Sequence, residues 1–208
     1  VLLFDGLSTL AGQSLDEQVI AQQQKVYAQL RAGQLDTRRG LDDSLLSPLM
    51  SLRMFDAIAQ LQAQYLSLQT VKLPQVEDKL GKDFVGRSVY RYEPDGHRLV
   101  REAFGFAKGK QLLMVVDAGC HFSSDAMARL SSDAGFAQLA RDAHLVILTP
   151  PASSAPTFML SQWNRAHAEW PIQVASNRGE WREIDAPAVP IFYVFENGKL
   201  IHSEKGWA

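Results

Sequence analysis

The sequence predicts an α/β protein, a mixed β-sheet flanked by helices and preceded by an N-terminal helical extension. Apolar residues recur with a helical spacing of three to four through about the first 80 positions. From Gly86 onward they instead form short alternating or continuous runs, as strands do. Helical and strand patterns then alternate along the chain, which is typical of helices packed on a sheet. We therefore expect a helical extension over residues 1–83 and an α/β domain over residues 84–208.

Composition limits the classes of protein that this chain can belong to. Of its 208 residues 46% are hydrophobic and 21% are charged, and the formal net charge is −2. Such a chain can bury a sizeable core, and its dispersed basic residues disfavour nucleic acid as a partner. No apolar stretch approaches the roughly 20 residues that span a bilayer. The single cysteine, Cys120, excludes an internal disulfide and a site made of several thiolates.

The first expected helix runs from about Ser14 to Ala32. Ser14 and Glu17 have the spacing of a capping box, in which each side chain bonds the other residue's amide. Gly33 follows as a left-handed stop. The apolar stripe of this helix comprises Leu15, Val19, Val26 and Leu30.

The second expected helix runs from about Ser47 to Gln69, with Ser47 as its cap and Pro48 at the first helical position. Part of its apolar stripe, Ile58, Leu61, Tyr65 and Leu68, has spacings of three, four and three. Two explanations remain open for this stripe: packing against the chain's own body, or a coiled-coil seam that makes a homodimer. Proline, glycine and charged residues between Leu73 and Gly86 indicate the linker.

The α/β domain is expected to open and close with β-hairpins. The first joins strands 88–92 and 98–102 through a turn at Pro94–Gly96, and the last joins 191–195 and 200–202 through Asn197–Gly198. The elements expected between them are a buried strand at 112–116, a helix at 121–130 continuing or restarting through 136–141, a strand at 144–149, a helix at 157–168 and a strand at 171–175. Core packing is the expected role of Trp163, Trp170 and Trp181, with a substrate-facing rim as the alternative.

Cys120 lies where the buried strand at 112–116 gives way to a helix. Amide groups at a helix N-terminus stabilise a thiolate, which is the nucleophilic form of cysteine. Ser123, three residues further along the same turn, could donate a hydrogen bond to the sulfur, and a protonated His121 would add attraction. The location therefore predicts a reactive thiol, whereas an isolated cysteine elsewhere is most often a small buried hydrophobe.

These features together resemble the thioredoxin superfamily, and within it the TlpA-like thioredoxins. The resemblance covers residues 84–207 and depends on the motif at Cys120–Ser123, the late Val189–Pro190 and the closing hairpin. It implies that Cys120 is the attacking cysteine, that Ser123 replaces the second, resolving cysteine, and that His121 and Phe122 form the variable pair between them.

The resemblance also implies a substrate-binding role for Phe122, Val189 and Pro190. Pro190 matches the cis-proline that faces the motif in this family, and the backbone of Val189 would pair with a bound substrate chain. Two positions depart from the family pattern. Gly119 stands where most members have tryptophan, and Met114 stands where many have a buried acidic residue.

A single thiol restricts the chemistry to a mixed disulfide that another thiol must resolve. The implied function is thiol–disulfide exchange, reductase-like or isomerase-like, with a protein disulfide substrate or a partner thiol protein. Glutathione is one candidate for the resolving thiol, and no other cofactor is expected. No metal is expected, because the five histidines lack ligand spacing. The alternative is a redox-inactive thioredoxin-fold module that binds proteins in an envelope or secretion assembly.

Localisation is inferred from the resemblance. TlpA-like domains mostly act in the bacterial periplasm or at the outer face of the membrane, and a chain that begins with Val1 is compatible with removal of an export signal. We therefore expect a periplasmic protein.

Overall fold

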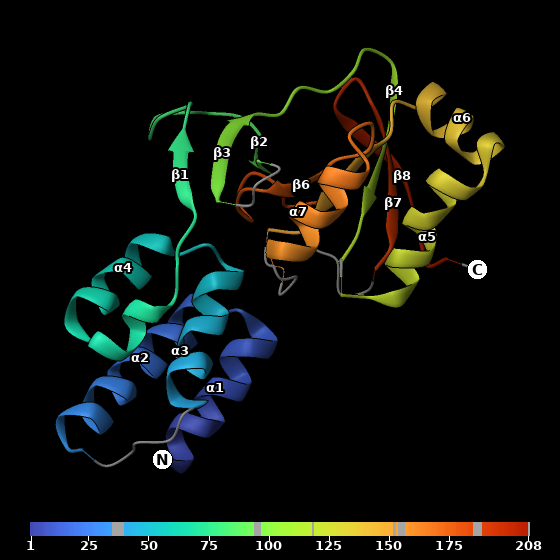
Figure 1. Ribbon diagram of the computed structural model, residues 1–208. Coiled ribbons are helices and arrows are strands. Elements are labelled where there is room, and N and C mark those ends of the chain that lie inside the picture. Colours follow the sequence, from blue (N-terminus) through green and yellow to red (C-terminus); the bar gives the residue numbers. More distant parts are fainter. Residues whose placement is uncertain are drawn as a thin grey trace. The chain divides into compact units, whose positions relative to one another are not determined.

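The computed structural model of the chain (Figure 1) describes residues 1–34, 40–93, 97–117, 119–151, 153, 157–184 and 189–207. The chain divides into two compact units, Val1–Leu73 and Pro74–Ala208. The division thus falls ten residues before the expected boundary at 83/84. The reason is strand β1 (Gln75–Asp78), which pairs with a strand of the second unit and extends that unit into the segment expected to be a linker.

Among the described residues, the regular elements of the first unit are all helices. Its elements are α1 (Leu2–Ser14), α2 (Glu17–Ala32), α3 (Gly40–Ser51), α4 (Phe55–Gln64) and the short 3₁₀ helix η1 (Leu66–Thr70). They enclose a core of their own, whose largest buried side chains are Phe4, Ile20, Tyr27, Leu45, Leu49, Ile58 and Leu68. The helical extension therefore has a core made entirely from its own residues.

The predicted helix at 14–32 was wrong at its start. Ser14 is the last residue of α1, and its hydroxyl donates to the carbonyl of Leu10 at 2.7 Å. Asp16 caps α2 instead, accepting hydrogen bonds from the amides of Gln18 and Val19 at 2.7 and 3.2 Å. The helix stop also differs, because Gly33 has a right-handed φ of −82°.

The predicted helix at 47–69 was also wrong, because the structure breaks it into three elements. Pro48 lies inside α3, where the chain is already helical, and Arg53 has a positive φ of 55° between α3 and α4. The apolar stripe nevertheless packs within its own unit. Ile58 and Leu68 are fully buried, and Tyr65 meets the edge of Tyr27 at 5.1 Å between ring centroids. Packing against the chain's own body accounts for these contacts.

The second unit is built on one mixed sheet. Among the described residues it has eight strands in the order β1-β3-β2-β6-β5-β4-β7-β8. Besides β1, the strands are β2 (Ser88–Tyr92), β3 (Arg98–Ala103), β4 (Lys110–Val115), β5 (Val146–Thr149), β6 (Ile172–Ala175), β7 (Ile191–Glu196) and β8 (Lys199–Lys205). The pairs β4/β5 and β5/β6 are parallel, whereas β4/β7 and β7/β8 are antiparallel.

The sequence prediction of this sheet is confirmed apart from β1. Both hairpins are present, and Asn197 and Gly198 have the positive φ values, 48° and 79°, that a tight hairpin turn requires. The turn expected at Pro94–Gly96 lies outside the described residues. β8 forms one edge of the sheet, and all seven of its residues are exposed.

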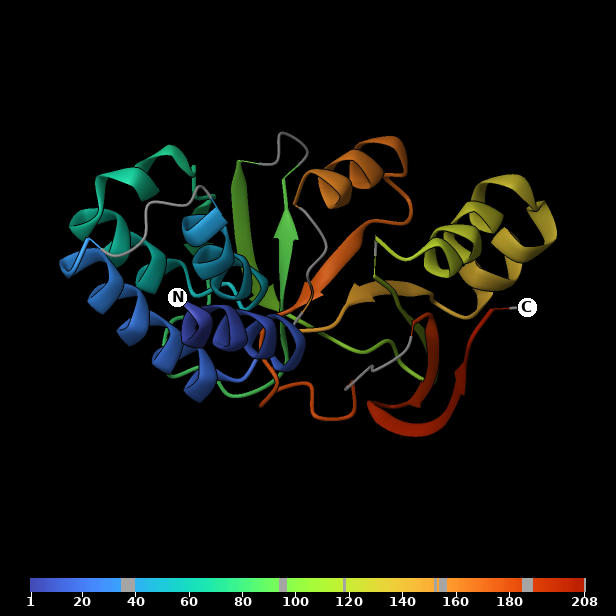
Figure 2. The ribbon, with the colours of Figure 1, turned by 90° about the horizontal axis from the view of Figure 1, so that it is seen from below.

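In the described part of the second unit three helices accompany the sheet: α5 (His121–Ser132), α6 (Ala134–Asp142) and α7 (Thr157–Ala166). In Figure 2 they lie on the same side of it. A core cluster without helix residues combines strand residues such as Leu113 and Phe195 with Trp181 and Ile184 from the segment after β6. Phe104 and Phe106, which follow β3, pack against the same cluster. Among the described residues, loop segments thus supply aromatic side chains to this part of the core alongside Tyr193 and Phe195 of β7.

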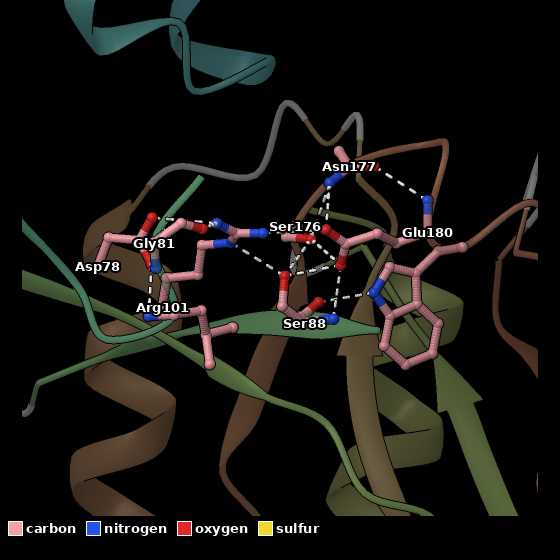
Figure 3. A network of polar contacts seen from close by, with 9 residues as sticks. Asp78, Gly81, Ser88, Arg101, Ser176, Asn177 and Glu180 are labelled. Carbon is pink, nitrogen blue, oxygen red and sulfur yellow. Dashed lines mark hydrogen bonds and ion pairs between the residues drawn. The ribbon is translucent and has the colours of Figure 1, made fainter. Parts of the chain in front are cut away.

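A polar network centred on Arg101 and Glu180 joins the β2–β3 hairpin to the segment after β6 (Figure 3). The two side chains form an ion pair of 3.1 Å, and each is 15% exposed. The Arg101 guanidinium also reaches Asp78 of β1 at 3.0 Å and the hydroxyl of Ser88 at 3.0 Å. The network thus connects the edge strand β1 to the interior of the sheet.

The Glu180 carboxylate accepts four further hydrogen bonds of the network. The Ser88 backbone amide and hydroxyl donate at 2.6 and 2.7 Å, the Ser176 hydroxyl at 2.8 Å and the side-chain amide of Asn177 at 2.7 Å. Burial by itself raises the pKa of Glu180, but the hydrogen bonds from Ser88, Ser176 and Asn177 outweigh it and hold that pKa below its ordinary value. Glu180 therefore acts as a charged acceptor that fixes the start of β2.

Candidate active site

The turn between β4 and α5 positions Cys120 as the N-cap of the helix. Asp117 shapes this turn, because its carboxylate accepts from the Gly119 amide at 2.8 Å and its carbonyl accepts from the Cys120 amide at 2.9 Å. The Cys120 carbonyl then accepts from the Ser124 amide at 3.0 Å and begins α5. The lone thiol is partly exposed. β4 and α5 therefore place a free thiol at a helix N-terminus.

The thiol lies beside the segment that precedes β7. The Cys120 Sγ donates a weak hydrogen bond to the Val189 carbonyl at 3.7 Å. The Val189–Pro190 peptide bond is cis, and Pro190 is buried. These residues are 69 and 70 positions from Cys120 in the sequence. The central pair β4/β7 brings them together, since Val115 of β4 is in register with Ile191 of β7.

Ser123 lies on the inner side of α5 and is fully buried. Its hydroxyl oxygen accepts a hydrogen bond from the Asp117 amide at 3.2 Å, so it helps to hold the helix to the end of β4. An accepting hydroxyl keeps its own proton to donate. The expected donation from Ser123 to the sulfur of Cys120 therefore stays a prediction.

His121 and Phe122 lie at the surface on the first turn of α5. Their ring centroids are 3.8 Å apart, and Phe122 is 49% exposed. The pair therefore offers an aromatic surface next to the partly exposed thiol.

Asp117 is the positioning residue that the sequence analysis did not assign. The sequence carried a signal for this role, because an aspartate two residues before a glycine is typical of a side-chain-to-amide turn.

Among the described residues, no group of three or more His, Cys, Asp or Glu side chains is placed to hold a metal ion. Within the same part of the chain, no helix has the length and apolar character needed to cross a membrane.

The strand order defines the fold of the second unit as thioredoxin-like. Three parallel strands, β6, β5 and β4, continue into the antiparallel hairpin β7–β8, and the candidate site follows the carboxyl end of β4. The chain is thus an α/β protein with a thioredoxin-like mixed sheet and an N-terminal helical segment.

Comparisons with solved structures find proteins of low similarity to this chain. A thioredoxin-like protein solved in its oxidised form is 19% identical, with a TM-score of 0.42 over 61% of this chain and 83% of that one. The pneumococcal exposed lipoprotein thioredoxin Etrx1 from Streptococcus pneumoniae is 16% identical, with a TM-score of 0.40 over 58% and 90%. StoA from Bacillus subtilis is 15% identical, with a TM-score of 0.37 over 48% and 76%. No family model and no curated protein match the chain.

Proposed function

We propose that the second unit is a thiol–disulfide exchange protein of the TlpA-like type that acts through Cys120 in a monothiol Cys-His-Phe-Ser motif. The observation that carries the proposal is the 3.7 Å contact between the Cys120 Sγ and the Val189 carbonyl. This contact places the partly exposed thiol of Cys120, at the N-terminus of α5, beside the backbone of Val189. A nucleophilic thiol needs access, stabilisation of its thiolate and a surface that aligns the partner disulfide.

The reaction has two exchange steps. The Cys120 thiol first gives its proton to water, and the thiolate attacks one sulfur of a substrate disulfide. One S–S bond breaks as another forms, the second substrate sulfur leaves as a thiolate, and Cys120 is held in a mixed disulfide. An external thiolate then attacks this mixed disulfide and releases Cys120. The external thiol is glutathione, a partner protein thiol or a second thiol of the substrate.

Each remaining residue of the site has an assigned part in this scheme. Ser123 holds the first turn of α5 to β4 and offers its hydroxyl proton to the sulfur. His121 and Phe122 form the outer surface that a substrate meets first. Val189 and Pro190 align the substrate backbone, and binding there replaces the weak contact of the Val189 carbonyl with the thiol. A periplasmic location belongs to the same proposal.

The test is the reduction of a peptide–glutathione mixed disulfide in the presence of reduced glutathione. We expect the wild-type protein to accelerate it and Cys120→Ser to lose the acceleration. A matched control moves the thiol: Cys120→Ser combined with Ser132→Cys keeps one cysteine but puts it at the exposed C-terminal end of α5. This variant should react no faster than a free thiol.

Equal rates for wild type and Cys120→Ser would refute the exchange function and favour the redox-inactive binding module. Mass spectrometry of protein purified without reductant gives an independent readout. An adduct on Cys120 would identify both its reactivity and the thiol that resolves it.

A further inference from the structure

A cavity of about 270 Å³ lies between α5, α7 and β6. Its lining includes Ser124 and Met127 from α5, Met159, Trp163 and Ala166 from α7, and Ile172 from β6. Apolar surface predominates, and the polar side chains of the lining are those of Ser124, Gln162 and His167. Among the described residues the lining holds no carboxylate, ammonium or guanidinium group. Such a lining favours an uncharged, apolar occupant.

The cavity begins at Ser124, one turn of α5 beyond Cys120. Cys120, Ser124 and Met127 are spaced by four and three residues, so they form one stripe on the helix. The Ser124 hydroxyl, at the near end of the lining, donates to the Cys120 carbonyl at 3.2 Å. At about 1.5 Å of rise per residue, Ser124 and Met127 are about 6 and 10 Å from Cys120 along the axis.

Hydrogen bonds hold the far wall of the cavity in place. The Trp163 indole donates to the Trp170 carbonyl at 2.7 Å, and the His167 ring stacks on it with centroids 3.6 Å apart. The buried amide of Asn164 donates to the Ile172 carbonyl at 3.0 Å and accepts from the Ile172 amide at 2.7 Å. The wall is therefore formed before any ligand arrives, which lowers the entropic cost of binding.

The volume of the cavity indicates the size of its occupant. Pockets for drug-sized ligands and cofactors have volumes of about 300–1,000 Å³. The volume of this cavity falls below that range, yet it is many times the roughly 30 Å³ that one water molecule occupies in the liquid. It matches a single large side chain, and the flexible side chains of Met127 and Met159 can adapt to its shape.

We propose that this cavity binds a large apolar side chain of the disulfide substrate, two or three residues from the cysteine that Cys120 attacks. The inference rests on the proposed exchange function and adds a substrate class to it. An extended peptide advances about 3.3 Å per residue, so two or three residues cover the 6 to 10 Å from Cys120 to Ser124 and Met127. The substrate is thus a peptide segment with an aromatic or long aliphatic residue at that distance from its cysteine.

The test uses short peptides whose single cysteine carries an aryl disulfide, so that attack by Cys120 releases a coloured aryl thiolate. The peptides come in pairs that differ at one position, which is phenylalanine in one peptide and serine in the other. In separate pairs this position lies two or three residues before the cysteine, or two or three residues after it. We expect the wild-type protein to react about 10-fold or more faster with phenylalanine in at least one pair, because burying an aromatic ring gives a gain of this size.

Two variants locate the effect. Ala166→Trp fills the cavity from an exposed position near the end of α7 and should remove the preference for phenylalanine. Ala134→Trp puts the same side chain at an exposed position of α6, outside the cavity, and should keep the preference. A preference that survives Ala166→Trp, or equal rates for each phenylalanine and serine pair, would overturn the inference.

A small aryl disulfide without a peptide separates this inference from the proposed function. If Cys120 reacts with it no faster than free cysteine does, the exchange function itself fails. If Cys120 reacts faster with it but shows no preference between the peptides, only the side-chain pocket fails.

Discussion

The hydroxyl oxygen of Ser123 accepts a hydrogen bond from the backbone amide of Asp117 at 3.2 Å. This bond anchors Ser123, on the first turn of α5, to the end of β4. Residues three apart on a helix are neighbours, within the separation that a disulfide can bridge.

Ser123→Cys should therefore acquire an internal disulfide with Cys120. Treated with oxidised glutathione, the variant should lose two hydrogens in mass spectrometry and retain no free thiol, whereas the wild type should accumulate a glutathione adduct. Ser132→Cys is the matched control, because its added thiol lies three turns from Cys120 and should form no internal disulfide. Two stable glutathione adducts on Ser123→Cys would contradict the expected geometry.

Acid should destabilise the second unit through Glu180. The hydrogen bonds that Glu180 accepts make its pKa lower in the folded chain than in the unfolded chain. A carboxyl group of this kind stabilises the fold above its unfolded-state pKa, about 4.3, and the contribution is lost as pH falls through the folded-state value. Urea unfolding should therefore show a falling free energy below about pH 4.3.

Glu180→Gln should flatten that acid dependence and lower the unfolding free energy at pH 7 by about 2 kcal/mol, since charge-assisted hydrogen bonds are lost. Glu183→Gln is the control. Its carboxylate pairs with Arg87 at 2.8 Å but is 37% exposed, so the change should stay below about 1 kcal/mol. If the two substitutions lowered the unfolding free energy equally, the network around Glu180 would stabilise the fold no more than an exposed ion pair does.

Asn164→Leu should destabilise the second unit by about 2–4 kcal/mol. The substitution removes two hydrogen bonds to Ile172 and leaves a buried amide and a buried carbonyl without these partners, each at a cost of about 1–3 kcal/mol. The shift of the urea midpoint of the full chain measures this loss. Gln162→Leu changes an exposed residue on the same helix and should shift the midpoint little.

Tyr27→Phe should weaken the first unit by about 1–2 kcal/mol. The Tyr27 hydroxyl donates to Asp42 at 2.7 Å and accepts from Arg31 at 3.0 Å, and both of these charged groups lose a partner in the variant. Tyr65→Phe keeps the ring contact with Tyr27 and should change the free energy by less than about 0.5 kcal/mol. A Tyr27→Phe protein as stable as the wild type would show that the hydroxyl is dispensable.

Local patterns predicted the junction that carries the thiol. The continuous apolar run from Leu112 to Val116 can only be a short buried element, and Cys120 follows it at the distance of a helix cap. The closing hairpin could also be predicted from the sequence, because Asn197–Gly198 is a turn signal that needs no tertiary context.

Features that depend on distant partners could not be predicted. β1 is a four-residue, mostly polar strand that exists through its parallel pairing with β3. Arg101 and Glu180 meet although 79 residues separate them. In α1, Gly6 and Gly12 weaken the helical propensity, and packing of Phe4 and Ala11 into the core compensates for it. The cavity beside α5 likewise needs α7 to be in place.

The exposed edge strand β8 has a consequence for how this protein behaves at high concentration. An edge strand offers unpaired backbone groups to other chains, and Leu200 and Ile201 add apolar surface to it. Lysines stand at both of its ends, Lys199 and Lys205, and Glu204 precedes the second. A neighbouring molecule that extended the sheet would have to strip water from these charges. The strand thus carries its own protection against edge-to-edge aggregation.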